Sequence, residues 1–97
     1  MIQHVVLFRF QPGTAAERIV RLGDELRALE EKIPVVLGLQ CGRNFSDRSQ
    51  GYEFGLTVQV EDRHALEVYR DHPAHRHVVE HHIRPIAADL LAVDFES

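Results

Sequence analysis

A tyrosine and two histidines lie close together in the C-terminal half of the sequence. Tyr69, His72 and His75 fall within seven residues, and Pro73 lies between the two histidines. An imidazole, whose ordinary pKa is ~6.5, can take up a proton near neutral pH. A phenol hydroxyl can donate a hydrogen bond to an oxygen on which negative charge develops. The segment predicts either a site of proton-transfer chemistry or the lining of a ligand pocket.

The same three residues also have a purely structural interpretation. His72 can cap the end of the preceding helix, where a cation or a donor to free carbonyl groups is favourable. His75 can be a hydrogen-bonded core histidine, and Tyr69 a core aromatic residue whose hydroxyl lies at the edge. The residue types alone leave the catalytic and the structural interpretations open.

Two other groups of potentially reactive side chains are interpreted as structural. His77 and His81 have the i,i+4 spacing that can hold Zn²⁺ or Ni²⁺. They fall on the predicted solvent side of a helix, without a third ligand in the sequence, so we expect a solvated face and no metal. Cys41 belongs to no motif and is interpreted as a small strand residue. No cofactor is expected.

Composition limits the class of protein. The chain has 97 residues, 44% hydrophobic and 27% charged, which fits one soluble globular domain over residues 1–97. Its net charge of −4 and the lack of a basic patch argue against nucleic acid as a partner. A single cysteine excludes an intrachain disulfide. The sequence shows neither a signal peptide nor an apolar run approaching the ~18 residues of a membrane span, so we expect a cytoplasmic protein.

Hydrophobic periodicity predicts alternating strands and helices. Strands are expected at 2–10, 35–45, 52–60 and 90–96, and helices at 14–33, 62–72 and 74–83. Thr14 and Glu17 have the spacing of a capping box, Asp62 is a good N-cap, and Pro34 and Pro73 end helices. Gly23 lies beside the apolar stripe of the first helix. We interpret it as a close contact between helix and sheet rather than the floor of a small cavity.

This order predicts an α+β fold of the ferredoxin-like βαββαβ type, a four-stranded antiparallel sheet with its helices on one face. The other face of the sheet would be bare. It carries Val5, Leu7 and half of the residues from Leu90 to Val93. An exposed apolar sheet of that size usually marks an interface. We therefore expect a homodimer packed sheet to sheet about a two-fold axis.

Three segments together resemble one family, the stress-responsive dimeric α/β-barrel (Dabb) domain. They are the opening strand His4–Phe10, the hairpin from Gly51 to Asp62, and the C-terminal stretch that includes Tyr69-x-x-His72-Pro73-x-His75, Ile83-Arg84-Pro85 and Val93-Asp94-Phe95. The resemblance covers nearly the whole chain. It implies a ferredoxin-like monomer and a dimer whose two sheets form a barrel.

One plant branch of that family, the olivetolic acid cyclases, closes a linear polyketide by an aldol condensation without a cofactor. The resemblance places its catalytic tyrosine and histidine at Tyr69 and His75, and its opening-strand histidine at His4. Phe54 stands where the cyclases have a histidine, and Leu26 where they have a tyrosine. These departures make the expected pocket more apolar and put the cyclase substrate in doubt.

An aldol closure needs a base for a proton next to a carbonyl and a donor that holds the enolate oxygen. His75 suits the first task and Tyr69 the second. His4, Phe54 and His72 are expected to bind ligand or to orient the pair. The favoured function is binding of an apolar, carbonyl-bearing small molecule between helices and sheet, with cyclase-like chemistry. The alternatives are a non-enzymatic dimer with a filled pocket and a cofactor-free monooxygenase-like barrel.

Overall fold

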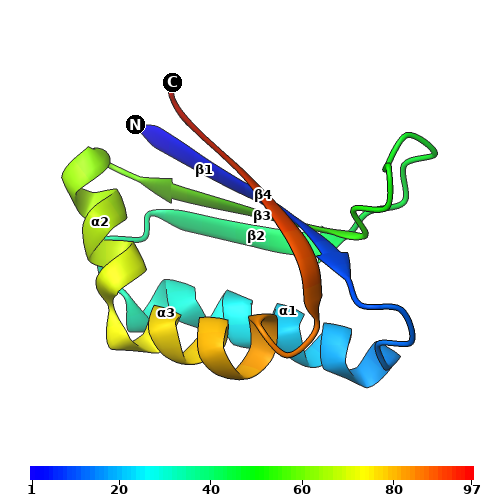
Figure 1. Ribbon diagram of the computed structural model, residues 1–97. Coiled ribbons are helices and arrows are strands. Elements are labelled where there is room, and N and C mark those ends of the chain that lie inside the picture. Colours follow the sequence, from blue (N-terminus) through cyan, green and yellow to red (C-terminus); the bar gives the residue numbers. More distant parts are fainter.

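The computed structural model describes all 97 residues. Four strands form one antiparallel sheet, and all helices lie on a single face of it (Figure 1). The ferredoxin-like arrangement predicted from the sequence is confirmed. The strand order across the sheet is β2-β3-β1-β4, which puts the first strand beside the last. The elements are β1 (Ile2–Phe10), α1 (Ala16–Lys32), β2 (Gly38–Arg43), β3 (Phe54–Val60), α2 (Arg63–Asp71), α3 (Pro73–Val78), a π-helical turn η1 (Val79–Ile83) and β4 (Ala87–Glu96).

The core lies between the sheet and the helices. Alternate residues of β1 and β3 point toward the helices, as the period of two requires. The apolar stripe of α1 meets them, and its five predicted members are all buried. This stripe consists of Ile19, Leu22, Leu26, Leu29 and Ile33.

Two helix starts differ in how well the sequence predicts them. Asp62 caps α2 as expected, because its Oδ1 accepts a hydrogen bond from the backbone N–H of Ala65 at 2.8 Å. The capping box predicted at Thr14 is wrong. Ala15 is the N-cap of α1, and the Thr14 hydroxyl instead donates to the carbonyl of Gln11 at 2.6 Å. The Thr14 hydroxyl, which a capping box would use, is therefore bonded within the short turn after β1.

The helical segment after Pro73 is less regular than predicted. Pro73 occupies the first turn of α3, a position where its missing N–H costs no hydrogen bond. The expected helix over 74–83 stays α-helical only to Val78 and continues as the wider turn η1. Such π-helical turns are rare and often lie near functional sites.

The last strand, β4, is mostly exposed to solvent. It starts at Ala87 rather than at Leu90. Its register with β1 places Leu91 opposite Leu7 and Val93 opposite Val5, on the face that no helix covers. The predicted bare apolar face therefore exists. Its members are Val5, Leu7, Leu91, Val93 and Phe95, here called the outer-sheet patch.

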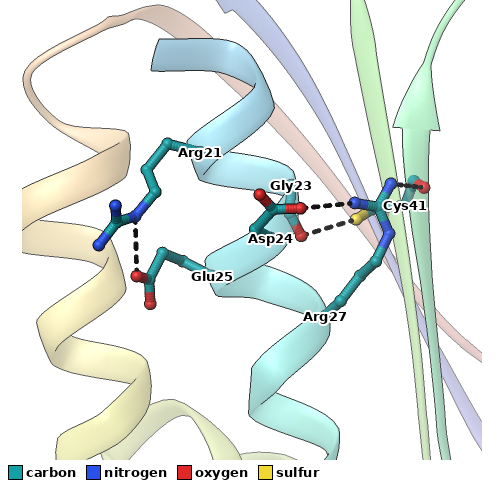
Figure 2. Close-up of polar contacts among 6 residues, drawn as sticks. All are labelled: Arg21, Gly23, Asp24, Glu25, Arg27 and Cys41. Carbon is teal, nitrogen blue, oxygen red and sulfur yellow. Dashed lines mark hydrogen bonds and ion pairs between the residues drawn. The ribbon is translucent and has the colours of Figure 1, made fainter. Parts of the chain in front are cut away.

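Gly23 brings α1 close to the sheet, but it also lines a hollow of about 180 Å³, so the structure shows both the predicted contact and the small cavity set against it. A side-chain carbon at Gly23 would lie 3.5 Å from the Phe54 ring and 3.1 Å from the Arg27 guanidinium. Figure 2 shows the resulting junction, in which the Cys41 thiol donates a long hydrogen bond to the Gly23 carbonyl at 3.7 Å. Arg27 donates to the Cys41 carbonyl at 3.1 Å and also faces Asp24. Burial raises the pKa of the Cys41 thiol, consistent with a structural cysteine.

None of the helices is long and apolar enough to cross a membrane.

Candidate functional site

Tyr69 lies at the centre of the candidate site and is completely buried. It comes from the last turn of α2, whose buried face also holds Ala65 and Leu66. Its hydroxyl has no hydrogen-bond partner in the core. Burial also raises the pKa of the phenol well above its ordinary value, so the hydroxyl keeps its proton at neutral pH. Tyr69 is therefore a protonated donor without an acceptor, which is unusual for a buried polar group.

His75 packs against Tyr69 from the next helix. The ring centres are 4.5 Å apart, and Nδ1 of His75 lies 3.0 Å from the carbonyl oxygen of Arg70. A carbonyl only accepts hydrogen bonds, so this contact requires the neutral ring to carry its proton on Nδ1. Burial lowers the pKa of the imidazole, which favours the neutral form. Nε2 is left with a free lone pair, the requirement for a general base.

His4 approaches Tyr69 from the sheet. Its ring lies edge-on to the phenol, with centres 6.0 Å apart, and is buried. Nδ1 of His4 lies 2.5 Å from Oδ1 of Asp94, the residue directly opposite on β4. The other carboxylate oxygen accepts from the Arg70 guanidinium at 2.9 Å. The Asp94 carboxylate thus fixes the orientation of the His4 imidazole, a common role for a carboxylate bonded to one ring nitrogen of a histidine.

Arg70 and Asp94 were not predicted as part of the site. Arg70 is linked to both histidines, because its backbone carbonyl accepts from Nδ1 of His75 and its side chain donates to the Asp94 carboxylate that binds His4. Asp94 lies directly opposite His4 on the neighbouring strand. Predicting their contact would have required the register between β1 and β4. Without the strand order, nothing in the sequence joins the two residues.

His72 has a local role. Its Nδ1 accepts a hydrogen bond from the backbone N–H of Ala74 at 3.0 Å, so it caps the start of α3. The structural interpretation placed this side-chain cap at the end of the preceding helix. The structure places it at the start of the following one, α3. This cap fixes the turn around Pro73 and so sets the position of His75 relative to Tyr69. The structure does not bring the His72 ring into the group of His4, Tyr69 and His75.

Phe54 belongs to a different part of the core. It packs edge-on against Phe8 and Phe10, with ring centres 5.7 and 6.2 Å apart. In the sheet it pairs with Phe8, four residues along β1 from His4. It lines a small hollow of about 180 Å³ beside Gly23. Phe54 therefore closes the far end of the helix–sheet layer rather than the surroundings of Tyr69.

Two surface cavities flank the candidate site. One is a groove of about 380 Å³ between α2 and β4, which includes Arg70 and Asp94 in its wall. The other is a hollow of about 300 Å³ beside His75. Arg70 lines both of them, whereas Tyr69 lines neither. A ligand in either cavity could therefore contact Arg70, and a ligand in the hollow could also contact His75.

Three further histidines, His77, His81 and His82, form a separate cluster. The rings of His77 and His81 lie 4.4 Å apart, and Nε2 of His82 is 3.9 Å from Oε1 of Glu25. No group of three or more His, Cys, Asp or Glu side chains has the geometry of a metal site. His77 and His81 are both exposed, as predicted for a solvated helix face.

The fold and the site together define a class. It is a ferredoxin-like α+β domain in which a tyrosine and two histidines meet beneath the sheet. The family model of the stress-responsive A/B barrel domain, Dabb, matches residues 2–97. The chain belongs to this family, as its motifs suggested.

Known relatives agree with this membership. An uncharacterized protein of Streptomyces coelicolor is 36% identical over 78 residues, which cover 78% of this chain and 80% of that protein. A stress-response A/B barrel domain-containing protein of Arabidopsis thaliana is 26% identical over 98% of this chain. The chain spans only 36% of that protein's length.

Solved structures show the same fold. A dimeric ferredoxin-like protein of unknown function from Thermobifida fusca aligns with a TM-score of 0.88 at 26% identity, over 99% of this chain and 90% of its own. A hydroxynitrile lyase from Passiflora edulis aligns with a TM-score of 0.87 at 12% identity, over 97% and 90% of the two chains. An antibiotic biosynthesis monooxygenase aligns with a TM-score of 0.78 at 19% identity, over 100% and 98%. At these identities the two enzymes share the fold alone.

Proposed function

We propose that this protein is a cytoplasmic homodimer that binds an apolar, carbonyl-bearing small molecule next to His75 and Tyr69 and transfers a proton to or from it. His75 takes the proton from the carbon next to the carbonyl through Nε2. Tyr69 donates its hydroxyl proton in a hydrogen bond to the enolate oxygen. An intramolecular aldol closure is one reaction that such an enolate can undergo.

The observation that carries the proposal is the complementary state of the two side chains. His75 is held as a neutral ring with Nε2 free, because Nδ1 donates to the Arg70 carbonyl. Tyr69 is a buried donor whose hydroxyl lacks an acceptor. Leaving a buried hydroxyl unpaired costs about 1–3 kcal/mol of free energy. A ligand that supplies an acceptor for it would recover that free energy on binding. The pair matches a base and a donor for one enolate.

The dimer part of the proposal rests on the outer-sheet patch. Leu91, Val93 and Phe95 each remain nearly half exposed on a face that no helix covers. The Thermobifida fusca protein is described as dimeric. Packing two such faces together about a two-fold axis buries the patch on both copies at once.

The test of the chemistry is proton exchange next to a ketone. We would incubate the protein in D₂O with 4-acetylbenzoate, an aromatic methyl ketone that also carries a carboxylate, and follow loss of its methyl signal by ¹H NMR. The wild type is expected to exchange the methyl protons faster than buffer alone. His75→Gln is expected to lower that rate by about 10²–10⁴-fold, the usual contribution of a general base.

Matched variants make the result specific. Tyr69→Phe removes only the hydroxyl and is expected to reduce exchange while the fold is kept. His77→Gln changes an exposed histidine of the same helix and is expected to leave the rate unchanged. Equal rates in the wild type, His75→Gln and Tyr69→Phe would show that this pair does not act on the ketone.

One observation favours a second candidate function, a non-enzymatic dimer with a filled core. Tyr69 is completely buried and lines neither flanking cavity, so a ligand reaches its hydroxyl only if covering side chains move. In that case Tyr69 and His75 are packing residues. The two candidates separate in the exchange experiment, because only the first predicts turnover.

A further inference from the structure

The hollow beside His75 has a charge opposite to that of the protein as a whole. Three arginines and one glutamate line it, together with His75 and Val79. These charged residues are Arg70, Arg76, Glu80 and Arg84. With His75 neutral, they give the hollow a local charge of +2, whereas the net charge of the chain is −4. A concave cationic site on an acidic protein attracts anions selectively.

The arginines of this hollow differ in how far they are already neutralised. Arg70 is held by Asp94 at 2.9 Å. Arg76 meets Asp71 only at 3.8 Å, and both side chains are largely exposed. Arg84 forms no ion pair within 4.0 Å, and Glu80 pairs with neither neighbouring arginine although it lies four residues from each. Arg84 and, in large part, Arg76 therefore have donors free for a ligand.

The helix geometry explains why these charges share one hollow. Arg76 is in α3, while Glu80 lies in the π-helical turn η1 and Arg84 directly follows it. Arg70 enters from the end of α2, on the other side of Pro73. The break at Pro73 folds α2 and α3 into a corner, and His75 lies in that corner with its Nδ1 on the Arg70 carbonyl.

We propose that this hollow binds the carboxylate of the substrate, with Arg84 and Arg76 as its donors, so that the ligand of the site is a keto acid rather than a neutral ketone. The inference rests on the proposed function, because it gives the substrate class of the same site. A guanidinium binds a carboxylate through paired N–H donors, and such charge-assisted bonds are shorter and stronger than neutral ones. Val79 supplies an apolar wall for the carbon skeleton.

The volume fits a compact acid. About 300 Å³ is at the lower end of the range for small-molecule sites. A carboxylate on Arg84 and Arg76 would direct the rest of such a ligand toward His75, which lines the same hollow. The carboxylate then selects and orients the ligand, while the free Nε2 faces its reactive end. Arg76 and Arg84 act as binding residues and take no part in the proton transfer.

The test compares 4-acetylbenzoate with its neutral analogue 4-acetylbenzamide. Binding is followed by ¹H–¹⁵N NMR titration of the full chain at low ionic strength, where charge interactions are least screened. The acid is expected to bind at least about tenfold more tightly than the amide, the gain typical of one charge-assisted contact. Arg84→Gln is expected to weaken the acid by about tenfold and to leave the amide unchanged. Arg76→Gln should show a smaller effect of the same sign.

The control is Arg18→Gln, which removes the same charge from an exposed position on α1. Equal affinity for acid and amide would overturn the inference, and so would equal weakening by Arg84→Gln and Arg18→Gln. The two proposals fail separately. A preference for the acid that depends on Arg84, without proton exchange, supports the carboxylate site and refutes the enzyme. Exchange at equal rates on acid and amide supports the enzyme and refutes the carboxylate site.

Discussion

His4 and Asp94 are direct partners across the β1–β4 pairing, and Nδ1 of the imidazole lies 2.5 Å from Oδ1 of the carboxylate. The pair ties the core to the exposed last strand. His4 is buried, whereas Asp94 is partly open to solvent and also binds Arg70. One contact therefore sets both the orientation of a buried ring and the position of a guanidinium at the edge of two cavities.

Removing the carboxylate should destabilise the fold. Asp94→Ala leaves the Nδ1–H of His4 without an acceptor in a buried position, which costs about 1–3 kcal/mol in the free energy of unfolding. Urea denaturation at pH 7 measures it. Glu96→Ala is the matched control on the same strand, because its ion pair with Arg63 is largely exposed and should contribute less than about 1 kcal/mol. Equal losses in both variants would contradict the special role of the buried contact.

Tyr69→Phe should have opposite effects on stability and activity. The buried hydroxyl has no partner, so its removal relieves a desolvation cost and the free energy of unfolding should stay equal or rise by about 1 kcal/mol. Proton exchange should fall in the same variant. Thermal unfolding and the NMR exchange rate are measured on one preparation. A large loss of stability would mean that the hydroxyl has a partner, such as a buried water.

His75 predicts the pH dependence of both properties. Burial lowers its pKa in the folded protein below the ordinary value of ~6.5, so the unfolded chain binds its proton more readily. Stability from this residue is fully present above about pH 6.5 and is lost as the pH falls through the lowered folded-state pKa. Exchange activity should fall over the same interval, because protonation removes the lone pair of Nε2.

The measurement is a series of urea titrations between pH 5 and 7.5. The wild type should lose more stability toward low pH than His75→Gln, which has no group to titrate at this position. The contribution of His75 to the free energy of unfolding should increase with pH, because stability rises with pH wherever the unfolded state binds more protons. Parallel curves for the two proteins would show that His75 does not titrate in this range.

Charge on the outer-sheet patch should prevent the dimer. Leu91→Glu places a carboxylate at the centre of the apolar face, where pairing with a second copy would bury it unpaired. Analytical ultracentrifugation is expected to show a dimer for the wild type and a monomer for this variant. Val20→Glu, an exposed apolar position on α1, should remain dimeric. A wild-type monomer at micromolar concentration would refute the sheet-to-sheet interface.

The sequence predicted the layers of this fold because its periodicities are local. The stripe of α1 and the alternation of β3 each follow from short-range spacing, and burial confirms both. The ends of elements depended on competition between nearby groups. Thr14 could cap the helix or bond the carbonyl of Gln11, and the turn after β1 decided for the second. The irregular turn η1 left no such local signal.

The candidate site was predictable where its members are near in sequence, and at His4, which the family resemblance assigned to the site and which does lie beside Tyr69. Tyr69 and His75 are six residues apart on a broken helix, and they do meet. Phe54 was assigned to the same pocket by resemblance alone, but the register of β3 places it beside Phe8 instead. Asp94 and Arg70 were missed because their link to His4 exists only after the last strand has joined the first.

That joining has a consequence for folding kinetics. The β1–β4 ladder pairs residues at the two ends of the chain, and the backbone N–H of Ser97 bonds the carbonyl of Met1 at 2.9 Å. Closing so long a loop is entropically costly, and non-local pairings slow folding. The contact between His4 and Asp94 should therefore form late, after the hairpin and α1 have collapsed. A circular permutant that joins Ser97 to Met1 would make this pairing local, and should fold faster.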